Sequence, residues 1–311
     1  PPTATPGQSN KGYYSVDYGD IHFVVINPYF YETGSLVRDG NHVDGRPKYK
    51  PNGPSLLNEG ITAAQVEQLK QIQWLRSDLA KNKQRWTVVA CHIPSFSSMD
   101  HLDQTIDTTP VDPEVVNMRT RLLPILEEAQ YHVDLLVVAH TDAYSRAGII
   151  RKTGSTRKTD YVKNGNLGRY PSSNPYTKTS SERAYSYVLM GNSGRGGTQS
   201  SVAGKAYLPN RSILPLDKLW DNVTEYYAKG GSVELTFNEN RMDMRFIREA
   251  EGLNPFVVAD SFTVFKDVNT KTTKGYTANY PMPARASWPA GTYRWTSSAT
   301  GNTVLSTKRD E

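Results

Sequence analysis

Two histidines stand directly behind apolar segments, where they could bind a metal ion. His92 follows the run Trp86-Thr-Val-Val-Ala-Cys91, and His140 follows residues 133–139, which are apolar except for one aspartate. Asp142, just beyond His140, adds a carboxylate. Imidazole nitrogens suit zinc and iron, and carboxylate oxygens suit harder cations such as manganese. The three side chains therefore predict a metal site, with the capping of a turn as the alternative role for Asp142.

The elements that must bring the two histidines together can be predicted from the pattern of apolar residues. Both runs are rich in valine, which is typical of strands buried on both faces of a sheet. Between them, residues 114–130 predict a helix that Pro124 kinks or splits. Strand, helix and strand in this order favour an α/β fold with a parallel sheet. In such sheets, ligands collect beyond the carboxyl ends of the strands.

Further elements surround this unit. Thr62 and Gln65 form a capping-box pattern, and apolar residues then recur at helical spacing from Val66 to Leu79, which predicts one helix ending near residues 80–83. Gly19-Asp20 separates two apolar runs and predicts a hairpin. The strands expected in addition are residues 13–18 and 21–26 of that hairpin, then 184–190, 231–238, 241–248 and 257–266.

The remaining segments predict loops and ends. Residues 28–60 and 147–183 are polar and read as long surface excursions. The glycine cluster at residues 191–197 predicts a loop that approaches the site closely. We expect a linker or processed terminus over residues 1–12, one domain over 13–266, and a β-rich tail or small appendage over 267–311.

The composition narrows the class of protein. The net charge is +5, from 36 basic and 31 acidic residues that are spread along the chain, and no nucleic-acid recognition module is visible, so no nucleic-acid partner is expected. No apolar segment approaches the roughly 18 residues of a membrane span. The single cysteine, Cys91, is expected to be a buried thiol. Sequons at Asn210 and Asn222 favour a secreted glycoprotein.

An ordered series of motifs resembles the calcineurin-like metallophosphoesterases, especially their purple acid phosphatase branch. Residues 14–26 resemble the strand pair of that family, residues 73–79 its helix, and His92-Ile-Pro94 its Gly-His-x-Pro loop. Residues 139–146, Ala-His-Thr-Asp-Ala-Tyr-Ser-Arg, resemble its Gly-His-x-His-Ala-Tyr-Glu-Arg motif. The resemblance runs from about residue 13 to 266 and implies a four-layer α/β/β/α sandwich, here partial, with a β-rich C-terminal tail.

The resemblance also implies a binuclear metal site with divalent or mixed-valence iron, zinc or manganese. In that family, the histidines corresponding to His92 and His140 bind one ion. Asp142 stands where a histidine binds the other ion. Two such cations hold and neutralise a phosphoryl group during in-line displacement.

Other residues receive roles from the same resemblance. His101 lies near the place of a histidine that faces the substrate in purple acid phosphatases, where it could protonate the leaving alkoxide. A solvated loop position is the alternative for His101. The implied substrate-binding residues are Tyr144, Arg146 and Asn192. For Tyr144 and Arg146 the alternative is packing and pairing within the protein.

Two hypotheses about function stay open. The family has an early Asp, a Gly-Asp-x-x-Tyr pair and a Gly-Asn-His motif ahead of its strand pair, and this chain begins just past that point. The first hypothesis is a secreted hydrolase of phosphate esters, active if an N-terminal partner segment supplies the missing ligands. The second is an extracellular or cell-surface scaffold without bound metal that assembles with itself or a partner through loops or sheet edges. Ala139 and Asp142, which replace a glycine and a histidine of the family, favour the second.

Overall fold

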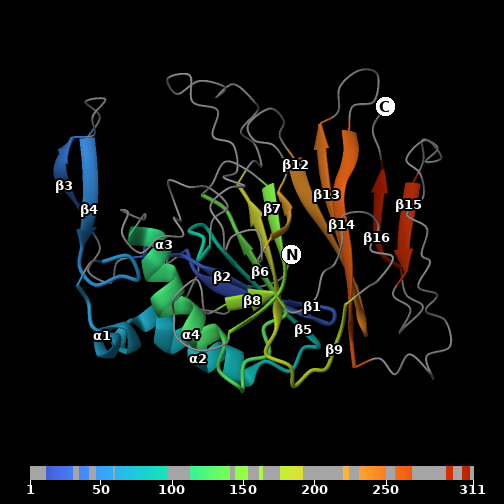
Figure 1. Ribbon diagram of the computed structural model, residues 1–311, viewed down its shortest axis with the longest axis horizontal. Helices are drawn as coiled ribbons and strands as arrows, with labels where there is room; N and C mark the ends of the chain where they lie inside the picture. The colour runs from blue at the N-terminus through green and yellow to red at the C-terminus, as the bar shows by residue number, and fades with distance from the viewer. Residues whose placement is uncertain are drawn as a thin grey trace.

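The computed structural model arranges helices, a large mixed sheet and a smaller sheet in successive layers, as Figure 1 shows. The prediction of an α/β fold is thereby confirmed in outline, with mixed sheets and few helices. The residues that the structure describes are 12–30, 35–41, 47–58, 60–96, 113–140, 144–152, 161–163, 176–191, 220–223, 231–249, 256–267, 292–296 and 303–308.

The large sheet has the two histidine-bearing strands near its centre. Its eight strands are β1 Tyr14–Tyr18, β2 Ile21–Ile26, β5 Trp86–Cys91, β6 Leu135–Val138, β7 Tyr144–Lys152, β8 Tyr161–Lys163, β10 Tyr185–Met190 and β11 Trp220–Val223. Their order is β1-β2-β5-β6-β10-β7-β11, and β8 pairs with β7. β2, β5, β6 and β10 are parallel neighbours. β1 pairs antiparallel with β2, which confirms the predicted hairpin.

Short helices cover one face of the large sheet, at the lower left of Figure 1. They are α1 Ala63–Gln68, α2 Lys70–Lys81, α3 Pro113–Asn117, the π-helical turn η1 Met118–Leu122, and α4 Leu123–Leu126. Their apolar side chains and those of the sheet form one buried cluster that includes Ile72, Leu75 and Tyr187. The predicted capping box is present, with Gln65 N–H donating to Thr62 Oγ1 at 3.2 Å. None of the helices in the described ranges is long and apolar enough to cross a membrane.

Two helix predictions need correction. The single helix expected to begin at Thr62 is two helices, because Leu69 has an extended backbone with ψ 128° between α1 and α2. The Leu69 side chain is nevertheless buried, so the apolar stripe continues across the break. The helix expected over residues 114–130 ends at Leu126, and Pro124 lies in the first turn of α4, directly after η1. A proline has no N–H and crowds the preceding turn, which accounts for the interruption.

The smaller sheet packs on the other face of the large sheet. Its strands are β9 Tyr176–Lys178, β12 Gly231–Asn238, β13 Arg241–Glu249 and β14 Phe256–Lys266, in the order β12-β13-β14-β9. A second buried cluster joins Trp86 and Leu135 of the large sheet to Met244 and Phe262 of the smaller one. The described layers are thus α/β/β. The fourth layer that the resemblance implies stays a prediction.

Some strands lie in segments that were expected to be irregular. Within residues 28–60, β3 Ser35–Asn41 pairs antiparallel with β4 Pro47–Asn52. Within residues 147–183 lie most of β7, all of β8 and all of β9. Backbone pairing does not require an alternating apolar pattern, so periodicity did not indicate these strands. In the predicted tail, β15 Thr292–Thr296 pairs only with β16 Thr303–Lys308 among the described strands.

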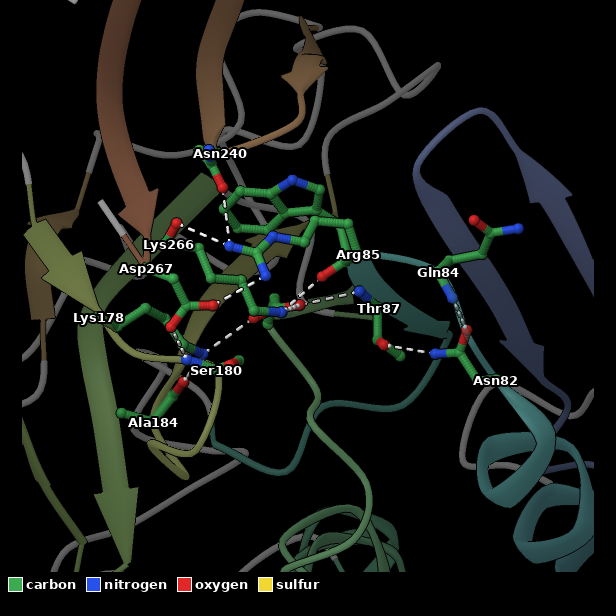
Figure 2. A network of polar contacts seen from close by, with 12 residues as sticks. Asn82, Gln84, Arg85, Thr87, Lys178, Ser180, Ala184, Asn240, Lys266 and Asp267 are labelled. Atoms are coloured by element: carbon green, nitrogen blue, oxygen red, sulfur yellow. Dashed lines mark hydrogen bonds and ion pairs between the residues drawn. The ribbon is translucent and has the colours of Figure 1, made fainter. Parts of the chain in front are cut away.

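A buried ionic network joins the two sheets at the amino ends of β5 and β6. Asp134 binds Lys178 Nζ at 3.0 Å through Oδ1 and Lys266 Nζ at 2.8 Å through Oδ2. The N–H of Thr87 also donates to Oδ2 of Asp134, at 2.9 Å. Figure 2 shows both lysines and the neighbouring Arg85, whose carbonyl accepts a hydrogen bond from Lys266. Burial lowers the pKa of Lys266, and the attraction of Asp134 opposes that shift. The network lies at the edge opposite to the two histidines.

Candidate metal centre

The imidazoles of His92 and His140 face each other at the carboxyl edge of the large sheet. Nε2 of His92 lies 3.3 Å from Nδ1 of His140. The ring centroids are 5.2 Å apart, and the ring planes are nearly perpendicular at 85°. His92 is exposed and His140 is partly exposed. The structure thus brings the two predicted ligands together where a solute can reach them.

Strand register explains this contact. β5 and β6 are parallel neighbours with Cys91 opposite Val138, and Ala139 N–H then donates to the carbonyl of His92 at 3.0 Å. His140 adopts a left-handed backbone with φ +66°. That conformation costs a residue other than glycine about 1–2 kcal/mol. The contact between the imidazoles therefore comes with local backbone strain, as is common at functional sites.

Tyr29 borders the histidine pair and was not among the site residues predicted from the sequence. It follows β2, and its ring centroid lies 6.0 Å from that of His92. Its hydroxyl donates to Glu114 Oε2 at 3.2 Å, and the residue is 39% exposed. Its position in the sequence could have indicated a place near the site, because Tyr29 follows the strand next to β5 and so lies at the same edge of the sheet.

Tyr144 and Arg146, which the resemblance assigns to substrate binding, lie inside the molecule between the two sheets. Both are 0% exposed. Asp260 of β14 accepts hydrogen bonds from Arg146 Nε at 2.6 Å and from the Tyr144 hydroxyl at 2.7 Å. Burial, together with the charge of Asp260, raises the pKa of Tyr144 well above its ordinary value. Packing and pairing within the protein, the alternative role of these two residues, therefore describes their environment in the structure, and substrate binding by them stays a prediction.

Three other predicted site residues, His101, Asp142 and Asn192, lie outside the described residues. Their roles in acid catalysis, metal binding and substrate binding therefore stay predictions. Within the described ranges, no group of three or more His, Cys, Asp or Glu side chains is placed to hold a metal ion.

Cys91 lies beside His92 in sequence but belongs to the core. It is 8% exposed, as the sequence predicted, and its Sγ contacts the carbonyl of Ile93 at 3.2 Å. Burial raises the pKa of the thiol to about 12. A thiol is a metal ligand only as thiolate, so this environment disfavours Cys91 as a third ligand.

The histidine pair fits two ligand positions of one metal ion. Histidine nitrogens lie about 2.0–2.1 Å from zinc, so two ligands of a tetrahedral ion are separated by roughly 3.3–3.4 Å. The distance between Nε2 of His92 and Nδ1 of His140 is 3.3 Å. The same separation allows one neutral imidazole to donate a hydrogen bond to the other. The arrangement can therefore hold either a proton or a cation between the rings.

Comparisons with known proteins give distant similarities to solved structures. No protein-family model matches the chain, and no curated protein does. A purple acid phosphatase from yellow lupin (Lupinus luteus) seeds is 18% identical with a TM-score of 0.48, over 85% of this chain and 34% of that one. A structure of PhoD is 14% identical with a TM-score of 0.45, over 82% of this chain and 42% of that one. The chain thus spans less than half the length of either structure.

Proposed function

We propose that this chain contributes His92 and His140 to a metal-dependent phosphoesterase site, as two ligands of one divalent cation. The observation that carries the proposal is the 3.3 Å separation of Nε2 of His92 and Nδ1 of His140, behind two parallel neighbouring strands. The motifs around both histidines resemble those of metallophosphoesterases, which supports a phosphate ester as substrate. Asp142 is the proposed ligand of a second cation, and further ligands would come from an N-terminal partner segment.

The residues of the chain have separate tasks in this proposal. The neutral imidazoles of His92 and His140 bind the cation through their lone pairs, and the two rigid strand ends keep the nitrogens in place. A bound divalent cation supplies the charge that stabilises the phosphoryl oxygens during displacement. His101 is the proposed general acid, because an imidazole with a pKa near neutrality can protonate a leaving alkoxide.

Turnover of p-nitrophenyl phosphate by the natively purified protein, together with its N-terminal partner segment, tests this function. We expect turnover to require added Zn²⁺, Mn²⁺ or Fe²⁺. His92→Ala and His140→Ala should each reduce it by about 100-fold or more, because even the loss of an outer-shell partner of a metal ligand costs about 10–100-fold. His132→Ala is the control, because His132 is an exposed histidine ahead of β6. Metal binding through both histidines without turnover would reject the hydrolase and leave a metal-binding protein. Turnover that persists in both variants would show that His92 and His140 do not form the active site.

A further inference from the structure

The loop that follows His92 is held from inside the core by one hydroxyl group. Tyr187 lies on β10 and is 0% exposed. Its hydroxyl oxygen accepts hydrogen bonds from the N–H groups of Ser95 and Phe96, both at 3.0 Å, and it donates to the carbonyl of Phe96 at 2.8 Å. A phenolic hydroxyl offers one hydrogen and two lone pairs. The loop therefore uses the whole hydrogen-bonding capacity of Tyr187.

Arg119 binds the same loop from the helical layer. Its Nε donates to the carbonyl of Ser95 at 2.9 Å, and its guanidinium lies over the ring of Phe96, 5.2 Å from the centroid. The residue is buried at 7% exposure. It belongs to η1, and single π-helical turns of this kind are frequent at functional sites. Two polar side chains from different layers thus converge on the loop.

These contacts anchor the backbone at His92 itself and again at Ser95 and Phe96. The carbonyl of His92 accepts the hydrogen bond from Ala139, which links it to the loop that carries His140. Three residues further on, Tyr187 holds Ser95 and Phe96. The direction of a Cα–Cβ bond is set by the backbone, so these anchors determine where the imidazole of His92 lies.

We infer that Tyr187 is a positioning residue for the histidine pair. Its hydroxyl holds the loop of residues 92–96 so that Nε2 of His92 faces Nδ1 of His140. A phenylalanine at this position fills nearly the same space but removes the hydroxyl that two buried N–H groups and one carbonyl bind, and losing hydrogen bonds of buried groups is costly. The loop then moves or admits water, and the imidazole of His92 leaves its place. The consequence for metal binding rests on the proposed function, whereas the consequence for the loop does not.

The matched pair of variants is Tyr187→Phe and Tyr185→Phe. Tyr185 lies on the same strand and in the same buried cluster, but its hydroxyl donates to Glu127 at 2.9 Å, at the end of α4. Titration with cobalt(II), followed by its visible absorption, measures the affinity of the histidine pair. We expect Tyr187→Phe to lose about tenfold or more in affinity, as for other groups that support metal ligands. Tyr185→Phe should bind cobalt as the wild type does. Equal losses in the two variants would overturn the positioning role.

Measurements on the metal-free chain keep the inference separate from the proposed function. Amide hydrogen exchange at Ser95 and Phe96, and the imidazole ¹⁵N shifts of His92 and His140 at one fixed pH, report the loop and the pair directly. We expect faster exchange and altered shifts in Tyr187→Phe only. Wild-type exchange rates and shifts in that variant would overturn the inference, whether or not its affinity for cobalt changes. If the wild type does not bind cobalt, the proposed metal centre is refuted. The exchange rates and the ¹⁵N shifts would still decide whether Tyr187 positions the loop.

A second variant covers the case in which Tyr187→Phe does not fold. Arg119→Lys removes the Nε donor to Ser95 and keeps the positive charge. It should accelerate exchange at Ser95 and shift the His92 signal, because the loop loses the side-chain contact that comes from the helical layer. Unchanged exchange and shifts in this variant would show that the polar contacts do not position the loop.

Discussion

Nε2 of His92 and Nδ1 of His140 lie 3.3 Å apart although 48 positions separate the residues in the sequence. The contact is built from backbone structure, because each histidine follows one of two parallel neighbouring strands and Ala139 links their loops. It also needs an unusual conformation at His140, with φ +66°. Mutations at the two positions can therefore separate the free-energy cost of the His140 backbone conformation from the role of the imidazoles.

The first prediction concerns the backbone of His140. His140→Gly and His140→Ala both remove the imidazole, but only glycine adopts a left-handed backbone without strain. We expect the glycine variant to be more stable than the alanine variant by about 1 kcal/mol, measured by urea unfolding. Ala80→Gly in α2 is the control, where glycine should cost about 1 kcal/mol instead. If the alanine variant is as stable as the glycine variant, the backbone of His140 is not strained.

The second prediction concerns the buried pair of Arg146 and Asp260. Both side chains are 0% exposed and are joined at 2.6 and 3.1 Å. Asp260→Asn removes the charge that balances the guanidinium, and we expect a loss of about 3–5 kcal/mol in the free energy of unfolding. Glu67→Gln, which weakens the exposed pair with Arg76, should cost less than about 1 kcal/mol. Similar losses in the two variants would show that Asp260 does not balance a buried charge.

The third prediction concerns the network around Asp134. Lys178 and Lys266 both form an ion pair with this one carboxylate. We expect Asp134→Asn to cost about 3–5 kcal/mol, because it leaves two buried ammonium groups with a neutral partner. Lys266→Met should therefore cost less in the Asp134→Asn background than in the wild type, which a double-mutant cycle measures. Additive costs would mean that the two side chains do not interact. Asp20→Asn, at an exposed turn, is the control.

The fourth prediction concerns His22, which lies between two aspartates. Nδ1 is 2.6 Å from Asp17 Oδ1, and Nε2 is 3.0 Å from Asp78 Oδ2. Burial by itself lowers the pKa of His22, but the hydrogen bonds and charges of Asp78 and Asp17 outweigh it and raise the pKa above its ordinary value. A raised folded-state pKa stabilises the protein fully below about pH 6.5, and this contribution disappears as the pH rises through the folded-state value.

Urea unfolding between about pH 5.5 and pH 9 measures this effect. We expect the free energy of unfolding of the wild type to fall across this window by more than that of His22→Gln, since the variant lacks the titrating group. His132→Gln, at an exposed histidine, should keep the wild-type profile. A wild-type profile in His22→Gln would show that the imidazolium does not stabilise the fold.

Local patterns were sufficient to predict the strands that carry the site. The apolar runs at residues 86–91 and 133–139 correspond to β5 Trp86–Cys91 and β6 Leu135–Val138. The pairing of these strands as parallel neighbours follows from the helix between them. Since such strands end at the same edge of the sheet, the proximity of His92 and His140 needed no further information than pattern and one packing rule.

Partners that come from distant parts of the chain could not be predicted in this way. Arg146 and Asp260 are 114 positions apart, and nothing near Arg146 indicates that a buried carboxylate will meet it. Asp134 interrupts an apolar run, and its lysine partners come from the other sheet. The break at Leu69 leaves the apolar stripe intact, so periodicity cannot detect it. In each case the missing information is three-dimensional packing.

The most direct test of the account is the stoichiometry and affinity of zinc binding by the 311-residue chain, measured by calorimetry after removal of bound metals. The account predicts that His92→Ala and His140→Ala each weaken binding by about tenfold or more, since even the loss of an outer-shell partner of a metal ligand costs about 10–100-fold. It also predicts that the double variant binds little more weakly than the worse single variant, because both imidazoles hold one ion, and that His132→Ala binds as the wild type does. Zinc binding that is unchanged in the double variant, or absent from the wild type, would contradict it.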